Sequence, residues 1–190
     1  MAYFPAFIKL DNIDILLVGG GNIASEKLLH LLDFTSNIKI ISPFLNENMK
    51  ELISKNNLNY EKKRYEKKDI NKFEIIVVAV DNIQLQKEIY KEAKCLNNCL
   101  VNSVDSINYC DFIFPSYIKK DDLTIAISTS GTSPAMAKYL KLYLEKLIPN
   151  SIGTFLKEMK EYRQIMPKGT KRMEFLSQKA KDYISTWNKD

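Results

Sequence analysis

Three consecutive glycines, Gly19 to Gly21, follow a short apolar run near the start of the chain and constrain its fold more than any other feature. The run before them, Ile15 to Val18, is unbroken and typical of a strand that is buried on both faces. A helical pattern begins directly after the glycines. The stretch therefore predicts a strand, a tight turn and a helix, the opening of a parallel α/β fold.

The small residues of this turn have the spacing G-x-G-x-x-A, which is typical of dinucleotide-binding turns. Gly19 allows a positive φ, Gly21 lets the backbone approach a pyrophosphate, and Ala24 lets the helix pack closely on the strand. Asn22 and Ile23 form the first helical turn, whose unpaired N–H groups bind phosphate. A glycine turn that only joins strand to helix is the alternative, but the strand before it and the helix after it favour dinucleotide binding.

The second predicted strand, Ile38–Ile41, should carry the residue that binds the adenosine ribose. An acidic residue there would bind the ribose hydroxyls of NAD, but the chain has Ser42 and Pro43. We assign Ser42 to the cofactor site. No arginine stands at this position either, so the strand end does not indicate NADP.

Two aspartates follow later strands of the same predicted sheet, Asp81 after Ile75–Val80 and Asp105 after Cys99–Val104. In an open parallel sheet, ligands bind at the carboxyl ends of the strands. Asp81 then contacts a bound ligand, or alternatively caps the helix that follows. Asp105 faces the nicotinamide end of a dinucleotide, or alternatively is an exposed turn residue, and the spacing favours neither.

The remaining pattern predicts three parts: a Rossmann-like dinucleotide-binding domain at 1–111, a small α+β dimerisation unit at 112–149, and a helical region at 150–190. Tyr3–Leu10 is predicted to lead into the core. Further strands are predicted at Leu58–Tyr65, Phe112–Phe114 and Leu123–Ser128, and helices at Asn22–Phe34, Asn46–Lys55, Ile83–Leu96, Thr132–Leu147, Ile152–Ile165 and Arg172–Trp187. Ser133 is the expected N-cap of its helix, with Pro134 at the first position.

The loop before that helix is rich in hydroxyl groups and contains Ser128, Thr129, Ser130, Gly131 and Thr132. Hydroxyls and backbone N–H groups at a helix start form an anion site, although helix capping alone would also explain them.

Composition excludes several classes of protein. The chain has 190 residues without an apolar run of 18 or a signal peptide, so we expect a cytoplasmic protein that does not enter a membrane. Cys95, Cys99 and Cys110 are odd in number and only His30 could join them as a ligand, so we expect no disulfide framework and no metal site.

The net charge of +5 is concentrated near the end of the chain, where residues 151–190 carry nine Lys and Arg against five Asp and Glu. A solvated helix face would explain this excess of positive charge. Attraction of a polyanionic ligand is the more specific alternative. Nucleic acid is not expected, because the region has no recognition motif.

Taken together, these motifs resemble the precorrin-2 dehydrogenase and sirohydrochlorin ferrochelatase family, which also forms the amino-terminal module of siroheme synthases. The matching segments are Leu17–Ala24, Ala79–Asn82, Val101–Asp105, Phe112–Pro115 and Ile125–Pro134. Ser130 stands where many relatives have a second glycine, and Val80 where many have threonine.

The resemblance implies NAD-dependent oxidation of precorrin-2 to sirohydrochlorin, with Asp105 as the acid/base. It implies that the loop at 128–132 binds the tetrapyrrole, that the C-terminal helices help to enclose it, and that the protein is a homodimer. Some relatives also insert ferrous iron, and the sequence leaves this second activity open. A regulatory module that senses a dinucleotide without catalysis is the alternative function.

Overall fold

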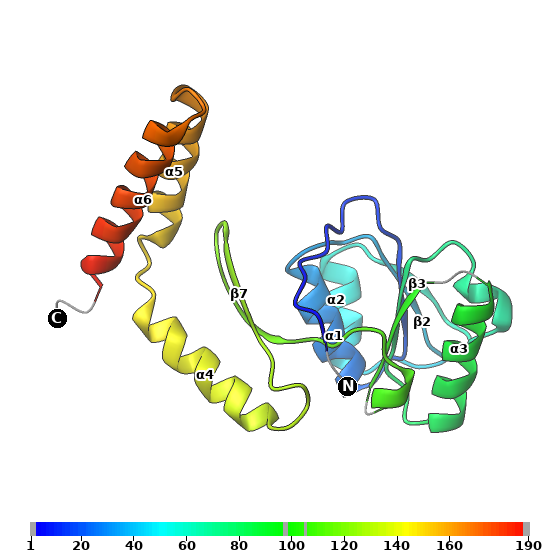
Figure 1. Cartoon of the computed structure of the whole chain (residues 1–190). Coiled ribbons are helices and arrows are strands. Elements are labelled where there is room, and N and C mark those ends of the chain that lie inside the picture. The colour runs from blue at the N-terminus through cyan, green and yellow to red at the C-terminus, as the bar shows by residue number, and fades with distance from the viewer. Residues whose placement is uncertain (1–2, 97–98, 105, 188–190) are drawn as a thin grey trace. The chain divides into compact units, whose positions relative to one another are not determined.

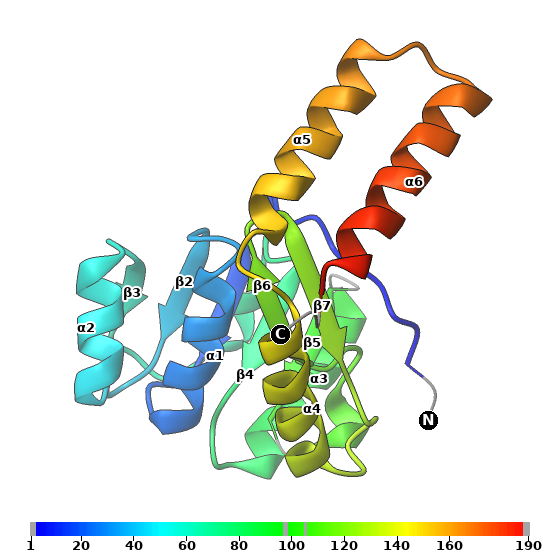
Figure 2. The same ribbon diagram turned by 90° about the vertical axis from the view of Figure 1, so that its left-hand side faces the viewer.

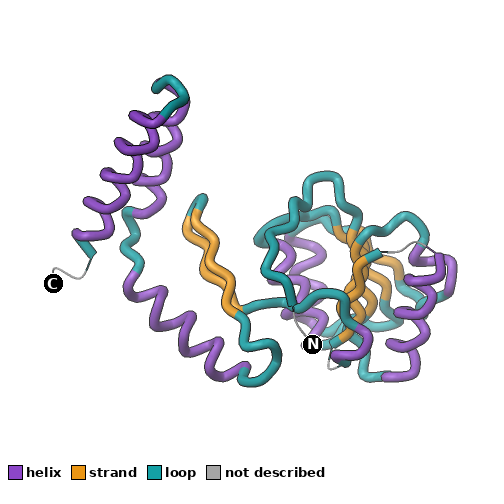
Figure 3. The backbone as a smooth tube through the Cα atoms, viewed as in Figure 1, coloured by secondary structure: helices purple, strands orange, loops and turns teal. Residues whose placement is uncertain are grey.

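The computed structural model describes residues 3–96, 99–104 and 106–187 and divides the chain into two compact units. The first unit comprises residues 4–113, and the second comprises 114–190 together with 1–3. Figures 1 and 3 show the elements of both units. The three-part division at 111 and 149 stays a prediction.

The first unit is a parallel sheet with helices on both faces, as predicted. Its described strands are β1 (Ile15–Val18), β2 (Ile38–Ile41), β3 (Asn59–Glu61), β4 (Ile75–Val78) and β5 (Leu100–Ser103), in the order β3-β2-β1-β4-β5. Its described helices are α1 (Asn22–Leu32), α2 (Glu47–Lys55), α3 (Ile83–Leu96) and two short 3₁₀ turns, η1 (Lys67–Ile70) and η2 (Ile107–Tyr109). Figure 1 shows α1 and α2 on one side of the sheet and α3 on the other.

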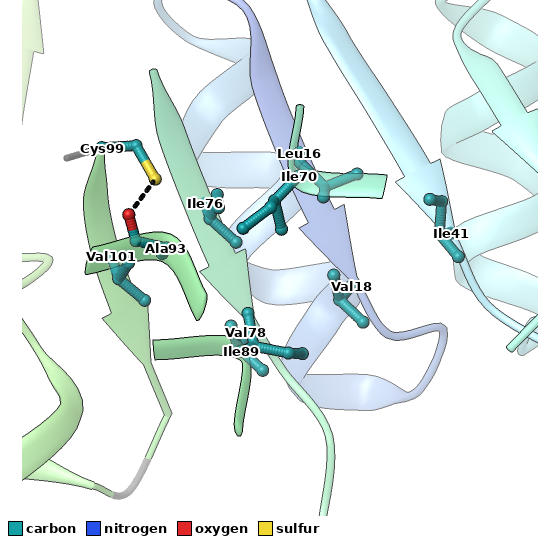
Figure 4. Close-up of a cluster of buried hydrophobic side chains, with 10 residues drawn as sticks. All are labelled: Leu16, Val18, Ile41, Ile70, Ile76, Val78, Ile89, Ala93, Cys99 and Val101. Carbon is teal, nitrogen blue, oxygen red and sulfur yellow. Dashed lines mark hydrogen bonds between the residues drawn. The ribbon is translucent and has the colours of Figure 1, made fainter. Parts of the chain in front are cut away.

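The strand register places the predicted cofactor-binding loops at one edge of the sheet. Val18 pairs with Ile41 on one side and with Val78 on the other, so β1, β2 and β4 end together. The side chains of β1 and β4 are buried on both faces, which explains their unbroken apolar sequences. Figure 4 shows the cluster that packs this sheet against Ile89 and Ala93 of α3.

The second unit combines a hairpin with three helices. Strands β6 (Ser116–Lys120) and β7 (Leu123–Ile127) are antiparallel, and α4 (Pro134–Leu147), α5 (Ile152–Ile165) and α6 (Thr170–Ser185) follow. Figure 2 shows α5 and α6 running side by side. Phe155 of α5 stacks on Tyr183 of α6 with ring centroids 4.0 Å apart, which joins the two helices.

Two sequence predictions about elements are wrong. The hairpin pairs 116–120 with 123–127, and Phe112–Phe114 forms no strand. The turn at Asp121 and Asp122 sets this register, because it pairs Lys120 with Leu123. Pro115 has no N–H to donate, so the ladder ends before it reaches residue 114. The opening segment does not enter the core, since Phe4 and Phe7 are 88% and 76% exposed.

Candidate functional site: a dinucleotide pocket

A cavity of about 880 Å³ lies at the carboxyl edge of the sheet in the first unit. Its walls come from the loops that follow β1, β2, β3 and β4 and from the start of α3. The lining residues are Val18–Ile23, Ile41–Phe44, Arg64, Tyr65, Ala79–Asn82, Gln84, Leu85 and Glu88. Of the predicted cofactor residues, Gly19, Gly21, Asn22, Ile23, Ser42 and Asp81 line this cavity.

The three glycines of the loop after β1 differ in what a side chain at each position would meet. Gly19 has a φ of +135°, and a Cβ there would stand 2.2 Å from the carbonyl oxygen of Ala79. A Cβ on Gly20 would stand 2.0 Å from the carbonyl oxygen of Phe44. Gly21 has an ordinary extended backbone and a Cβ there would meet no protein atom within 4 Å, so the fold does not require glycine at this position. A ligand that approaches the backbone closely is a reason for glycine at 21, and the site therefore fits a pyrophosphate.

The start of α1 supplies the electrostatic part of this site. Its N-cap, Gly21, makes no side-chain capping hydrogen bond, and no acidic residue stands in the first turn. Free N–H groups and the positive end of the helix dipole thus face the cavity without an internal anion. Asn22 is held in place because its Oδ1 accepts from Nδ2 of Asn46 at 2.8 Å. Ala24 does not line the cavity but is fully buried, in agreement with its predicted packing role.

Ser42 lines the cavity without offering its hydroxyl to a ligand. The hydroxyl donates to the carbonyl oxygen of Phe44 at 2.6 Å, and the residue is 2% exposed. This bond folds the loop after β2 over Gly20. Ser42 therefore shapes the ribose end of the site and does not replace the carboxylate of an NAD-specific site.

Asp81 is not the N-cap of α3, so the alternative role given to it is wrong. Asn82 caps the helix, because its Oδ1 accepts from the backbone N–H of Leu85 at 3.0 Å. The Asp81 side chain is exposed at the cavity. Its role as a ligand contact stays a prediction.

The predicted catalytic residue Asp105 lies outside the described residues. Its neighbour Val104 donates from its backbone N–H to the carbonyl oxygen of Val78 at 3.0 Å, and Ala79, the residue after Val78, lines the cavity. The Cys110 thiol binds the end of β5, donating to the carbonyl oxygen of Ser103 at 3.0 Å and accepting from its N–H at 3.2 Å. Burial raises the pKa of Cys110, so it stays a neutral thiol that can make both bonds.

The predicted substrate loop lies in the second unit, between β7 and α4. Thr129 Oγ1 accepts from the N–H of Ser133 at 3.1 Å and donates to its carbonyl oxygen at 3.0 Å, and Ser133 caps α4 as predicted. Ser130 and Gly131 have φ values of +52° and +82°. The loop is thus closed by its own hydroxyls, and its role in substrate binding stays a prediction.

Sequence reasoning missed the cavity residues that follow β3, of which Arg64 carries a charge. Loops after neighbouring parallel strands meet at one edge of a sheet, but no local sequence pattern shows that β3 is the neighbour of β2. Within the described ranges, no three His, Cys, Asp or Glu side chains gather to hold a metal. No helix in those ranges is long and apolar enough to cross a membrane.

Residues 6–116 match the model of a family described as putative NAD(P)-binding. The chain belongs to this NAD(P)-binding family. The matched range contains every wall of the cavity, so the part of the chain that forms the cavity is the part that matches the NAD(P)-binding family.

Curated relatives of this NAD(P)-binding chain are siroheme synthases, as the motifs predicted. One from Blochmanniella pennsylvanica is 37% identical over 153 residues, which cover 80% of this chain and 32% of the relative. One from Pseudoalteromonas translucida is 35% identical over 153 residues, which again cover 80% of this chain and 32% of the relative. The chain thus spans about a third of the length of these relatives. The solved structure of SirC, a precorrin-2 dehydrogenase, has the same fold, with a TM-score of 0.79 and 23% identity over 97% of this chain and 92% of that one.

Proposed function

We propose that this protein oxidises precorrin-2 to sirohydrochlorin with NAD as the acceptor. One observation carries the proposal: a cavity lined by Gly21, where a Cβ would meet no protein atom within 4 Å, occurs in a chain whose relatives are siroheme synthases. The solved fold neighbour is a precorrin-2 dehydrogenase, which supports the same reaction.

The oxidation removes one hydride and one proton from the macrocycle. Bound NAD supplies the hydride acceptor. The Gly19–Gly21 loop and the start of α1 bind and orient its pyrophosphate. Asp105 is proposed to take the proton, because it follows Val104 in the sequence, and Val104 binds Val78, the residue before Ala79 in the cavity wall. Removal of pyrrole N–H protons before iron insertion would call on the same carboxylate.

The second unit is proposed to hold the substrate and a second copy of the chain. Precorrin-2 bears many carboxylates, and residues 151–190 have an excess of Lys and Arg. Helix α4 exposes Met136, Tyr139 and Tyr143, spaced three and four residues apart on one stripe, by 52%, 69% and 62%. An apolar stripe of this kind fits a homodimer contact.

Anaerobic incubation of the protein with precorrin-2 and NAD, followed by the visible spectrum of the macrocycle, tests the reaction. We expect NAD-dependent conversion to sirohydrochlorin. Ferrous iron is then added, and insertion faster than in a protein-free control would establish the chelatase as well. No conversion in the presence of bound NAD would contradict the enzyme and favour the dinucleotide-sensing alternative.

Replacement of the proposed acid/base separates catalysis from binding. Asp105→Asn should lower turnover at least about a hundredfold, since general acid–base catalysis contributes that much or more, while leaving NAD affinity unchanged. Asp122→Asn is the matched control, because Asp122 is an exposed aspartate of the β6–β7 turn. Equal turnover in the two variants would remove Asp105 from the mechanism.

A further inference from the structure

The loop after β3 brings Arg64 into the wall of the dinucleotide cavity, 22 residues beyond Ser42 in the sequence. Strand pairing explains this approach. Ile41 of β2 pairs with Glu61 of β3, and the Ser42 N–H donates to the carbonyl oxygen of Glu61 at 3.3 Å. The two strands therefore deliver their following loops to the same end of the cavity, where a dinucleotide places its adenosine ribose.

The guanidinium of Arg64 has no internal counter-charge within the described part of the chain. Among the residues that the structure describes, it makes no hydrogen bond or salt bridge. The nearby carboxylates form salt bridges with lysines instead: Glu61 binds Lys39 at 2.8 Å, and Asp69 binds Lys63 at 2.6 Å. Arg64 is exposed and so is available to an anion that enters the cavity.

The ribose end of the cavity also lacks the group that normally excludes NADP. A carboxylate at the end of β2 binds the ribose hydroxyls of NAD and repels a 2′-phosphate. The structure has Ser42 at this place, with its hydroxyl bound to Phe44. The carboxylates that do line the cavity, Asp81 and Glu88, come from the loop after β4 and from α3.

We propose that Arg64 binds a 2′-phosphate on the adenosine ribose, so that this site takes NADP as well as NAD. Guanidinium groups bind phosphate through paired, charge-assisted hydrogen bonds. The inference rests on the dinucleotide site of the proposed function, but not on its tetrapyrrole substrate.

Calorimetric titration with two fragments tests the proposal without catalysis. ADP-ribose and 2′-phospho-ADP-ribose differ only in the phosphate. We expect the full-length protein to bind the phosphorylated fragment at least as tightly as the other. Arg64→Gln should weaken binding of the phosphorylated fragment about tenfold or more. It should weaken binding of ADP-ribose less than about twofold, because ADP-ribose has no 2′-phosphate to pair with the guanidinium. Lys62→Gln, an exposed cation two residues away, is the matched control and should change neither affinity.

Three results would overturn the proposal. An equal loss of affinity for both fragments in Arg64→Gln would show that Arg64 stacks on the adenine instead. Exclusion of the phosphorylated fragment by the unmodified protein would show that the site is specific for NAD. Failure to bind either fragment would remove the dinucleotide site itself. Binding of both fragments without conversion of precorrin-2 would leave this inference intact and contradict only the proposed reaction.

Discussion

Adjacent glycines of the loop after β1 have different tasks at the scale of single residues. Gly19 and Gly20 have no room for a side chain, because the carbonyl oxygens of Ala79 and Phe44 stand where a Cβ would be. Gly21 has room and an ordinary backbone. The fold therefore requires glycine at the first two positions, and the ligand role of the third stays a prediction.

Gly21→Ala should weaken NAD binding at least about tenfold while changing the free energy of unfolding by less than about 1 kcal/mol. Gly20→Ala is the comparison, and it should lower the free energy of unfolding by about 1 to 3 kcal/mol, because the new methyl group overlaps the Phe44 carbonyl. Calorimetry and urea unfolding measure the two quantities. Unchanged NAD affinity in Gly21→Ala would mean that the dinucleotide does not approach this backbone.

A buried carboxylate on α3 makes stability depend on pH. Glu92 is 9% exposed, and its Oε2 accepts from the Tyr65 hydroxyl at 2.9 Å. Burial raises the pKa of Glu92, so the folded state favours the protonated form more than the unfolded state does. This contribution to stability is present below the unfolded pKa of about 4.3 and is lost as the pH rises through the folded value.

Glu92→Gln should remove the loss of stability that ionisation of Glu92 causes as the pH rises. The free energy of unfolding of the unmodified protein should fall relative to that of Glu92→Gln as the pH rises from about 4 to about 7. Urea unfolding at several pH values measures the difference, with Glu51→Gln on the exposed side of α2 as the control. If the free energy of unfolding of the unmodified protein instead rose relative to that of Glu92→Gln as the pH rises, the ionised carboxylate would stabilise the fold.

At the scale of elements, one lysine joins the hairpin to the end of α4. Lys120 at the end of β6 donates from Nζ to the carbonyl oxygens of Ile148 at 2.6 Å and Glu145 at 3.3 Å. The last carbonyls of a helix have no internal donor, and a cation at this end also opposes the helix dipole. Lys120 therefore fixes where α4 stops relative to the hairpin.

Lys120→Met should lower the stability of the second unit by about 1 to 2 kcal/mol, because it removes a short charge-assisted bond to the half-buried carbonyl of Ile148. Lys138→Met, at an exposed position of α4, is the control and should have little effect. Fluorescence of Trp187 during urea unfolding reports on this unit, since the chain's single tryptophan packs against its core. Equal midpoints for the two variants would contradict the capping role.

Elements with strong local signals were predicted well from the sequence. The bounds of α3 and α5 are those expected from periodicity, and Ser133 and Pro134 marked the start of α4. The hairpin was misplaced because its register depends on which residues form the turn, a tertiary choice that β-propensity does not encode. Arg64 was missed because its place in the cavity follows from the pairing of β2 with β3, which no local pattern reveals.

At the scale of the whole molecule, the predicted cofactor and substrate residues belong to different units. The cavity lies in the unit at 4–113, and the loop at 128–132 lies in the other. A ligand that binds only the folded state stabilises it by about 2.7 kcal/mol at a hundred times its Kd. The location of that stabilisation therefore identifies the unit that binds the ligand.

Hydrogen exchange of the full-length protein should show this division. Saturating ADP-ribose is expected to slow amide exchange at 18–23, 42–44 and 79–85, which surround the cavity, and to leave 128–132 unchanged. Mass spectrometry of peptides with and without the ligand measures both regions. Protection at 128–132 by ADP-ribose alone would place that loop in the cofactor site rather than the substrate site.

The glycine loop also bears on how such a protein can diverge. One nucleotide change converts a glycine codon to an alanine codon, and at position 21 the fold has space for the product. If Gly21→Ala weakens NAD binding as predicted above, a lineage that is no longer selected for catalysis can lose its cofactor in a single step and keep an intact, folded chain. Inactive descendants of this fold should be recognisable by alanine or serine at this position beside two retained glycines.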